Sequence, residues 1–206
     1  MSGAGQLFII AAPSGAGKTS LVRALLESLE AVTVSVSHTT RAPRPGEREG
    51  QDYYYVNTQT FEQLIAADEF LEYARVFDHY YGTRRAEVDR KLVQGIDVIL
   101  EIDWQGAQQV RAKWPGSQGI FILPPSLSAL RQRLQQRGQD EPDVIERRMR
   151  DAVSEMSHYD EFDYLIINDE FEQSLAALRA IFIACRQRKE IQILRRQALI
   201  HGLLNQ

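Results

Sequence analysis

The 206-residue sequence predicts an α/β fold, in which helices cover both faces of a mainly parallel β-sheet. Short, almost fully apolar runs alternate along the chain with amphipathic stretches, as expected for strands that are buried on both faces. The first apolar run leads into a glycine-rich turn and then into a helical pattern. A chain of this length favours one domain with insertions over two independent domains.

The apolar runs predict strands, in chain order, at Leu7–Ala11, Val32–Ser37, Tyr53–Val56, Ile96–Ile102, Gly119–Leu123 and Tyr164–Ile167. Helical periodicity predicts helices at Thr19–Leu29, Phe61–Ala67, Arg85–Val93, Gln105–Lys113, Leu127–Arg137, Val144–His158 and from Phe171 onward. Two segments interrupt this alternation: residues 38–83 are polar and rich in Tyr, Arg, Pro and Gly, and residues 126–158 form an arginine-rich helical pair. Both are interpreted as insertions at the ligand-binding edge of the sheet.

The turn after the first strand has the composition of a phosphate-binding loop (P-loop). It consists of Ala12, Pro13, Ser14, Gly15, Ala16, Gly17, Lys18 and Thr19. In such a loop, backbone N–H groups surround the phosphates, the lysine reaches the β- and γ-phosphates, and the threonine hydroxyl can bind Mg²⁺. Ala12 stands where the usual spacing has glycine. Ser20 stands where a dinucleotide-binding fingerprint needs a third glycine, which disfavours that fold.

Composition excludes several classes of protein. The net charge of −4 argues against a general nucleic-acid binder. No signal-like start and no apolar run of membrane-spanning length are present, so we expect a soluble, cytoplasmic protein. The single cysteine, Cys185, excludes an internal disulfide and is expected to be buried. Arginine strongly outnumbers lysine, which fits phosphate recognition but also follows from genomic base composition.

A second anion-binding region is expected in the first insertion. Arg41 and Arg44 lie three residues apart on a proline-rich turn, which holds two guanidinium groups ready for a phosphate. On the strand that follows, Tyr53 and Tyr55 share one face and Tyr54 takes the other. The same residues would also be compatible with a mobile, solvated basic loop.

Glu72 is a candidate for base recognition. Guanine presents two adjacent donors, N1–H and N2–H₂, and a carboxylate can accept from both, whereas adenine presents an acceptor at N1. On a half-buried strand, Glu72 would project to the opposite side from Leu71. An exposed glutamate that only improves solubility is the alternative interpretation.

Glu101 and Asp103 lie two residues apart at the end of an apolar strand and are expected to share a strand face. Carboxylates at the end of a buried strand are costly unless they bind a cation or join a hydrogen-bond network. Close to a P-loop, water-mediated Mg²⁺ binding is a natural use. For Asp103, capping of the following helix is an equally good interpretation.

The second insertion concentrates positive charge on two neighbouring helices. Its arginines are Arg131, Arg133, Arg137, Arg147, Arg148 and Arg150. Most are expected to pair with nearby carboxylates, while one or two could act as arginine fingers supplied in cis to a transferring phosphoryl group. No general base is evident, which fits transfer to a phosphate, whose oxygen is already ionised near neutral pH (second pKa about 6).

Together these motifs resemble the guanylate kinase family. The matching segments are Ala12–Thr19, Val36–Glu47, Gly50–Val56, Phe70–Ala74, Tyr80–Thr83, Glu101–Ala107, Leu123–Ser126, Arg133–Gly138, Ile145–Met149 and Ile166–Asp169. The resemblance spans residues 5–185 and implies a P-loop NTPase-type core (5–37, 86–125 and 159–185). It also implies a GMP-binding insertion (38–85), a helical lid (126–158) and a C-terminal helical tail (186–206). The implied reaction is Mg²⁺-dependent transfer of the ATP γ-phosphoryl group to GMP, giving ADP and GDP.

The resemblance also implies a role for each candidate residue. The P-loop residues 12–19 would bind ATP together with Arg137, Asn168 and Asp169. The GMP phosphate would be bound by Arg41, Arg44, Tyr53 and Tyr81, and guanine by Ser37, Glu72 and Thr83. Asp103 would support both GMP and Mg²⁺, with Thr19 and Glu101 as further metal ligands; Glu101 stands where the family more often has the shorter aspartate. The catalytic groups would be Lys18, Arg44, Arg137 and Arg148.

The sequence is also compatible with two alternative functions. One is a related P-loop kinase that acts on another phosphorylated acceptor, such as a ribose phosphate. The other is a non-catalytic guanylate-kinase-like interaction domain that binds peptides, although such domains typically have degraded P-loops. The expected partners are ATP and GMP, with dGMP a plausible second acceptor, and neither nucleic acid nor membrane. The sequence leaves open whether the tail packs on its own domain or on another subunit, and therefore whether the protein is a monomer or a homo-oligomer.

Overall fold

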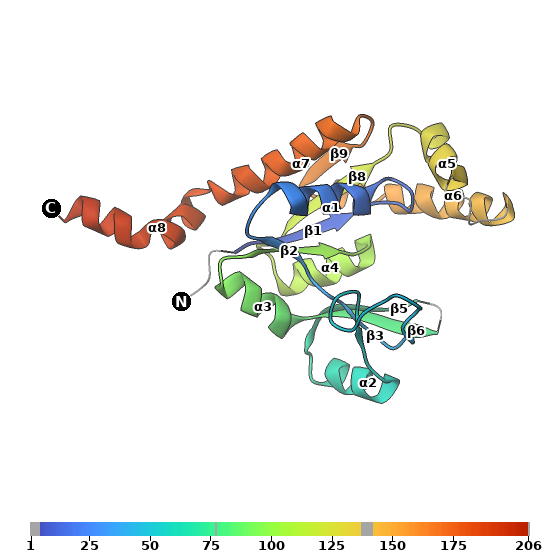
Figure 1. Ribbon diagram of the computed structural model, residues 1–206, viewed down its shortest axis with the longest axis horizontal. Helices are drawn as coiled ribbons and strands as arrows, with labels where there is room; N and C mark the ends of the chain where they lie inside the picture. Colours follow the sequence, from blue (N-terminus) through green and yellow to red (C-terminus); the bar gives the residue numbers. More distant parts are fainter. Residues whose placement is uncertain (1–4, 77, 137–141, 206) are drawn as a thin grey trace.

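The computed structural model describes residues 5–76, 78–136 and 142–205 (Figure 1). Its central sheet has five strands in the order β2-β7-β1-β8-β9, and all neighbouring strands are parallel. Their bounds are β1 Leu7–Ala11, β2 Val32–Val34, β7 Asp97–Glu101, β8 Gln118–Leu123 and β9 Tyr164–Ile167. The predicted α/β class with a parallel sheet is confirmed.

Helices cover both faces of this sheet because β1 is apolar on both sides. Phe8 and Ile10 belong to a core with α1 (Lys18–Ser28) and α7 (Phe171–Arg186), where the Phe8 and Phe182 rings stack with centroids 3.8 Å apart. Leu7 and Ile9 point the other way and pack with α3 (Arg85–Val93) and α4 (Trp104–Lys113). The alternation along a strand thus divides one apolar run between two cores.

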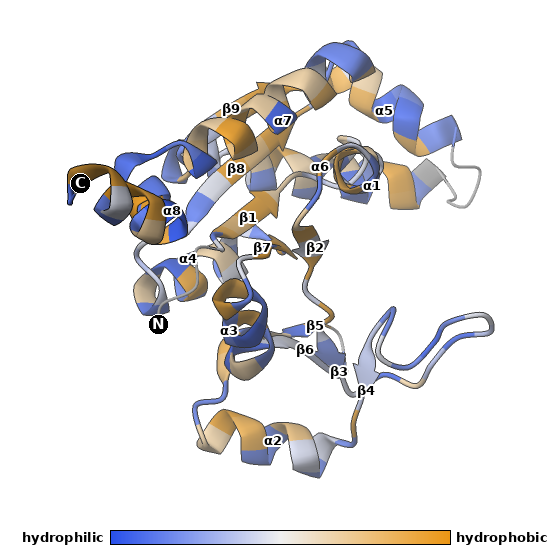
Figure 2. Ribbon diagram, turned by 60° about the vertical axis from the view of Figure 1, so that its left-hand side comes forward, coloured by the Kyte–Doolittle hydropathy of each residue, from blue (hydrophilic) through white to orange (hydrophobic). Residues whose placement is uncertain are grey.

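The first insertion contains a second sheet that the sequence predicts only in part. Its order is β4-β3-β6-β5, with bounds β3 His38–Thr39, β4 Tyr54–Tyr55, β5 Phe70–Val76 and β6 His79–Arg84, and it is accompanied by α2 (Thr58–Ala66). Only the strand around Tyr54 and the extended start of β5 are predicted. β5 and β6 form an antiparallel pair and are far less hydrophobic than β1 and β8, so apolar patterning does not reveal them (Figure 2).

The second insertion is a helical pair, α5 (Leu127–Gln136) and α6 (Pro142–Met156). Its helices are held together by a small apolar cluster of their own, which contains Leu130, Leu134, Ile145, Met149 and Ala152. A short 3₁₀ helix (Tyr159–Glu161) then returns the chain to β9. Because this cluster is separate from the two cores of the central sheet, the pair is a distinct packing unit.

The C-terminal helices are attached to the core through Asp97, a fully buried residue at the start of β7. Its carboxylate accepts hydrogen bonds from the Gln6 backbone N–H (2.9 Å) and from Arg186 Nε on α7 (2.7 Å). Arg195 Nη2 on α8 (Lys189–Leu204) lies 3.5 Å away. The beginning of α8 therefore contacts its own domain, while the rest projects from the molecule (Figure 1).

Replacing Asp97 with alanine leaves two arginines without this buried counter-charge. We expect a loss of about 3 kcal/mol in the free energy of unfolding, or roughly 6–12 °C in melting temperature. Glu27→Ala is the control, because it breaks the exposed Arg23–Glu27 pair, which should contribute less than about 1 kcal/mol. Thermal unfolding followed by circular dichroism measures both variants, and equal shifts would contradict the assigned role of Asp97.

Cys185 is buried, as expected, and its thiol lies near the Tyr164 hydroxyl. None of the helices in the described part of the chain combines the length and apolar character needed to cross a membrane.

Candidate active site

The P-loop connects the end of β1 to the start of α1 and depends on two glycines. Gly15 (φ 92°) and Gly17 (φ 96°) have left-handed backbone conformations that favour glycine. A Cβ atom on Gly17 would also lie 2.3 Å from Asn168 Nδ2. Ala12 has no positive φ, so the alanine at the usual glycine position is accommodated without strain. The loop and the first turn of α1 line a cavity of about 280 Å³.

Lys18, the first residue of α1, faces acidic side chains. Its Nζ lies 3.8 Å from Glu101 Oε2 at the end of β7. Burial lowers the pKa of Lys18, and the carboxylates of Glu101, Asp103 and Glu155 act in the opposite direction. The cation predicted to bind phosphates is therefore balanced by negative charge from the protein.

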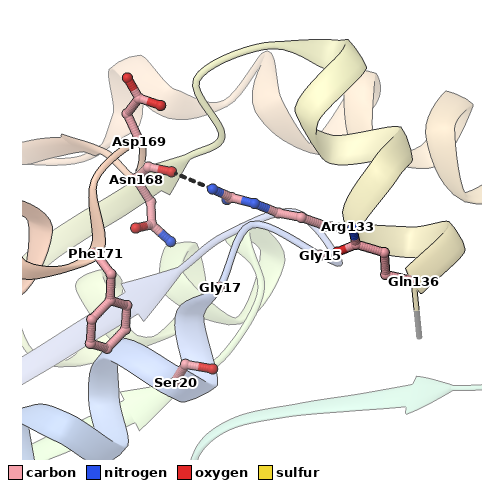
Figure 3. Close-up of a pocket in the computed structure, with 8 residues that line it drawn as sticks. All are labelled: Gly15, Gly17, Ser20, Arg133, Gln136, Asn168, Asp169 and Phe171. Atoms are coloured by element: carbon pink, nitrogen blue, oxygen red, sulfur yellow. Dashed lines mark hydrogen bonds between the residues drawn. The ribbon is translucent and has the colours of Figure 1, made fainter.

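A second cavity, of about 380 Å³, adjoins the P-loop and shares Gly15, Gly17 and Ser20 with the first cavity in its lining (Figure 3). Asn168 and Asp169, which follow β9, line this cavity. Asn168 Nδ2 donates to the Ala16 carbonyl at 2.7 Å, which ties the end of β9 to the loop. This cavity is large enough to hold a nucleobase next to the phosphate-binding amides.

Arg133 and Phe171 also line this cavity, and neither is predicted as a site residue. The Arg133 guanidinium donates to the Asn168 carbonyl at 2.9 Å (Figure 3). It also donates to the Ala16 carbonyl at 3.4 Å, so it connects α5 to the end of β9 and to the P-loop. The available signal was its spacing of one helical turn from Arg137. Arg137 itself lies outside the described residues.

A cluster of phenol rings surrounds Arg41 in the region where the sequence predicts a second anion site. Arg41 Cζ lies 5.4 Å from the Tyr53 ring centroid, and Glu47, with a smaller contribution from Tyr81, raises the pKa of Arg41. The Tyr53 and Tyr81 rings are 5.9 Å apart. Tyr55 lies beside Tyr53, whereas Tyr54 contacts His38, as the predicted alternation requires.

Glu47, for which the sequence predicts no role, organises this turn. Its carboxylate accepts from Arg41 Nη2 (2.8 Å), the Tyr55 hydroxyl (2.8 Å) and the Arg44 backbone N–H (2.7 Å). The hydrogen bond from Arg41, followed by that from the Arg44 backbone, lowers the pKa of Glu47 to about 2. The Arg44 side chain is exposed on the same turn.

Glu72 is buried on β5, so the interpretation as an exposed, solubilising residue is wrong. The Thr83 hydroxyl on β6 donates to Glu72 Oε1 at 2.6 Å. Leu71 is buried as well, because it packs with Leu7, Ile9 and Val88 in the core between the central sheet and α3 and α4. Burial raises the pKa of Glu72 to about 7, with the nearby Asp103 charge adding to the effect.

One cavity of about 290 Å³ joins the P-loop to the second sheet. Its lining includes Lys18, Thr19, Ser37 and Glu101 from the core, and Tyr53 and Thr83 from the first insertion. Groups suited to two phosphorylated ligands therefore face the same space from opposite sides.

Asp103 is not on a strand face with Glu101, because β7 ends at Glu101. Asp103 instead caps α4, and its Oδ1 accepts from the Gly106 N–H at 2.8 Å. The expectation that Glu101 and Asp103 share a strand face is therefore wrong, and the interpretation of Asp103 as a helix cap is confirmed. Arg148 is half-buried on α6, and Thr19 is exposed at the start of α1.

Within the described ranges, no three His, Cys, Asp or Glu side chains gather in a way that could hold a metal ion. A cation bound at Thr19 and Glu101 would therefore need further oxygen atoms from its ligand or from water. Magnesium in proteins usually binds in this manner, through one or two carboxylates together with phosphate oxygens and water.

Comparisons with known proteins agree with this geometry. A family model described as "Guanylate kinase" matches residues 4–185. Guanylate kinase from Alkalilimnicola ehrlichii is 61% identical over 188 residues, which cover 91% of this chain and 93% of the relative. Guanylate kinase from Shewanella oneidensis is 55% identical over 205 residues, 99% of each chain. A crystal structure of guanylate kinase from Anaplasma phagocytophilum has a TM-score of 0.70 at 33% identity, covering 95% of this chain and 96% of that one.

Proposed function

This chain belongs to the guanylate kinase family, and we propose that it transfers the γ-phosphoryl group of ATP to GMP, giving ADP and GDP. The observation that carries this function is the 290 Å³ cavity between Lys18 on the P-loop side and Thr83 on the second sheet. Phosphoryl transfer needs donor and acceptor to meet in line, and this cavity is the space in which they can meet.

ATP binds along the P-loop, with its phosphates at the amides of residues 12–19 and at Lys18. The neighbouring 380 Å³ cavity takes adenine beside Asn168 and Asp169. Arg133 supports that wall through its hydrogen bonds to Asn168 and Ala16. Arg137, outside the described residues, is assigned to the ATP phosphates by the family pattern alone.

Thr19, Glu101 and Asp103 are the residues that would hold Mg²⁺. Glu101 supports this role because its carboxylate lies in the cavity that Thr19 also lines. Asp103 uses Oδ1 to cap α4, so its second oxygen is the one suited to a metal-bound water. When bound, the metal neutralises phosphate charge and orients the triphosphate.

GMP binds on the second sheet. Glu72 accepts from the N1–H and N2–H₂ groups of guanine, with Thr83 and Ser37 beside it. Arg41, Arg44, Tyr53 and Tyr81 bind the phosphate through guanidinium and phenol donors. The distance from Thr83 Oγ1 to Glu72 Oε1, 2.6 Å, supports a preorganised acceptor for the base.

The reaction needs positioning and charge neutralisation rather than a general base. The acceptor phosphate oxygen is already ionised near neutral pH (second pKa about 6). Lys18 and the arginines, among which we include Arg44, Arg137 and Arg148, neutralise the two facing polyanions. Closure of the parts around the cavity excludes water, which would otherwise accept the phosphoryl group.

These roles correspond to a division of the chain into a core (5–37, 86–125 and 159–185), a GMP-binding insertion (38–85), a lid (126–158) and a tail (186–206). Two observations support the division. The strands of the second sheet all lie within 38–85. The α5–α6 pair has a separate apolar cluster.

A coupled ADP-release assay against GMP, dGMP, AMP, UMP and ribose bisphosphate tests the proposed reaction. We expect turnover with GMP to exceed that with AMP and UMP by more than about a hundredfold, because mismatched donors and acceptors leave buried groups unpaired. Turnover with ribose bisphosphate alone would support the other P-loop kinase, and absence of turnover with every acceptor would support an interaction domain.

A further inference from the structure

Glu155 is a carboxylate at the P-loop for which the proposed reaction has no use. It lies near the C-terminal end of α6, in the second insertion, and is half-buried. Its side chain lines the 280 Å³ cavity of the P-loop together with Ser14 and Lys18. Helix α6 of the proposed lid thus places a carboxylate at a loop whose backbone N–H groups are suited to bind phosphate.

Two of the groups near Glu155, Ser14 and Lys18, are also ones that a phosphate in the P-loop would contact. Ser14 N–H and Lys18 attract its charge, whereas Asp103 and Asp151 repel it. Burial has the largest influence on the pKa of Glu155 and raises it. A phosphate at the same amide would stand next to this carboxylate, and two anions at close range in a partly desolvated site repel one another strongly.

We propose that Glu155 is a displaceable internal anion that competes with the triphosphate for the P-loop. In the absence of a triphosphate, the Glu155 carboxylate compensates the positive charge of Lys18 and the partial positive charge of the Ser14 N–H. A bound triphosphate replaces the carboxylate at both groups. Binding of the triphosphate therefore expels Glu155 and moves the end of α6. This inference rests on the proposed function only in so far as a triphosphate uses the P-loop.

The position of Arg148 on the same helix connects the displacement of Glu155 to the proposed phosphoryl transfer. Residues 148 and 155 are seven positions apart on α6, about two helical turns, and so share one side of the helix. Arg148 is one of the residues to which we assign the transferring phosphoryl group. A single movement of α6 can then withdraw a negative charge from the phosphates and bring up a positive one, which links donor binding to lid closure.

Glu155→Gln tests the inference, because glutamine keeps an oxygen that can accept from Ser14 N–H and removes only the charge. We expect a non-hydrolysable ATP analogue to bind this variant about tenfold more tightly than the unmodified protein, as measured by isothermal titration calorimetry. Inorganic triphosphate should show the same gain, since the competition concerns phosphate and not the base.

Asp151→Asn is the matched control. Asp151 is exposed one turn earlier on the same helix, so the substitution changes the net charge equally. We expect its affinity for both probes to stay within about twofold of the unmodified protein, because an exposed charge is screened by solvent. An equal gain in both variants would mean that only the overall charge matters and would overturn the inference.

Unchanged or weaker binding by Glu155→Gln would also overturn it. Glu155→Ala, which suits a helix and removes the contact together with the charge, serves if the glutamine variant is unstable, and the same gain is expected. The proposed reaction fails separately: a gain in triphosphate affinity without GMP-dependent ADP formation would refute the kinase and leave this inference standing.

Discussion

Replacing Lys18 with methionine is expected to lower kcat by about 10²–10³-fold, because one preorganised cation is removed from the transferring phosphoryl group. Methionine has a similar length, so the P-loop can keep its shape. The Lys18–Glu101 pair is partly exposed, which limits the cost of losing it to stability. Steady-state kinetics with saturating ATP and GMP measures the effect, and circular dichroism verifies the fold.

Lys113→Met makes the same substitution away from the site. Lys113 lies on α4, where its Nζ is 2.6 Å from Asp68 Oδ1 and 2.7 Å from the Phe70 carbonyl. We expect this variant to keep kcat within about twofold, because Lys113 and Asp68 line none of the three cavities that we assign to ATP and GMP. A near-normal kcat in the Lys18 variant would remove that lysine from the mechanism.

Glu72→Gln is expected to reduce kcat/KM for GMP by roughly 30- to 1,000-fold, equivalent to about 2–4 kcal/mol. Glutamine replaces a charged acceptor and places an N–H₂ donor against the donors of guanine. The KM for ATP should change little, because the second sheet does not line the cavities that we assign to the triphosphate and adenine. Glu62→Gln, exposed on α2, is the control. A GMP KM unchanged by Glu72→Gln would refute the assignment.

The raised pKa of Glu72, about 7, gives the same residue a pH signature. Below this pH the carboxyl group is protonated before GMP binds, so kcat/KM for GMP should fall as the pH drops from 8 to 6. The variant should retain only the titration of the GMP phosphate itself (second pKa about 6). Because the pKa is raised relative to the unfolded chain, the same group favours the folded state at low pH and loses this contribution as the pH rises through 7.

The core of the fold could be predicted because its strands are apolar on both faces. Leu7–Ala11 is buried along its whole length and was assigned correctly to the residue. β3 and β6 could not be predicted in the same way, since their stability comes from pairing within the second sheet and from aromatic contacts such as Phe61 against Tyr80. Such pairing depends on residues distant in sequence, which periodicity does not record.

The candidate site shows the same limit. The P-loop is one continuous segment, and its conformation follows from local glycine chemistry. Arg133 donates a hydrogen bond to the carbonyl of Ala16, which is 117 residues away in the sequence. Nothing in the local sequence distinguishes Arg133 from the other arginines of its helix. Asp103 was compatible with both a metal-binding strand end and a helix cap, and only the point at which β7 ends decides between them.

The close approach of Gly17 to Asn168 has a consequence for protein engineering. Any side chain at position 17 would collide with the amide that holds the end of β9 against the loop. The left-handed backbone at Gly17 restricts that position to glycine as well, so only residue 168 is open to change. A substitution there removes the hydrogen bond from Asn168 Nδ2 to the Ala16 carbonyl and so disturbs the neighbouring P-loop. Libraries aimed at a different donor should therefore keep glycine at position 17.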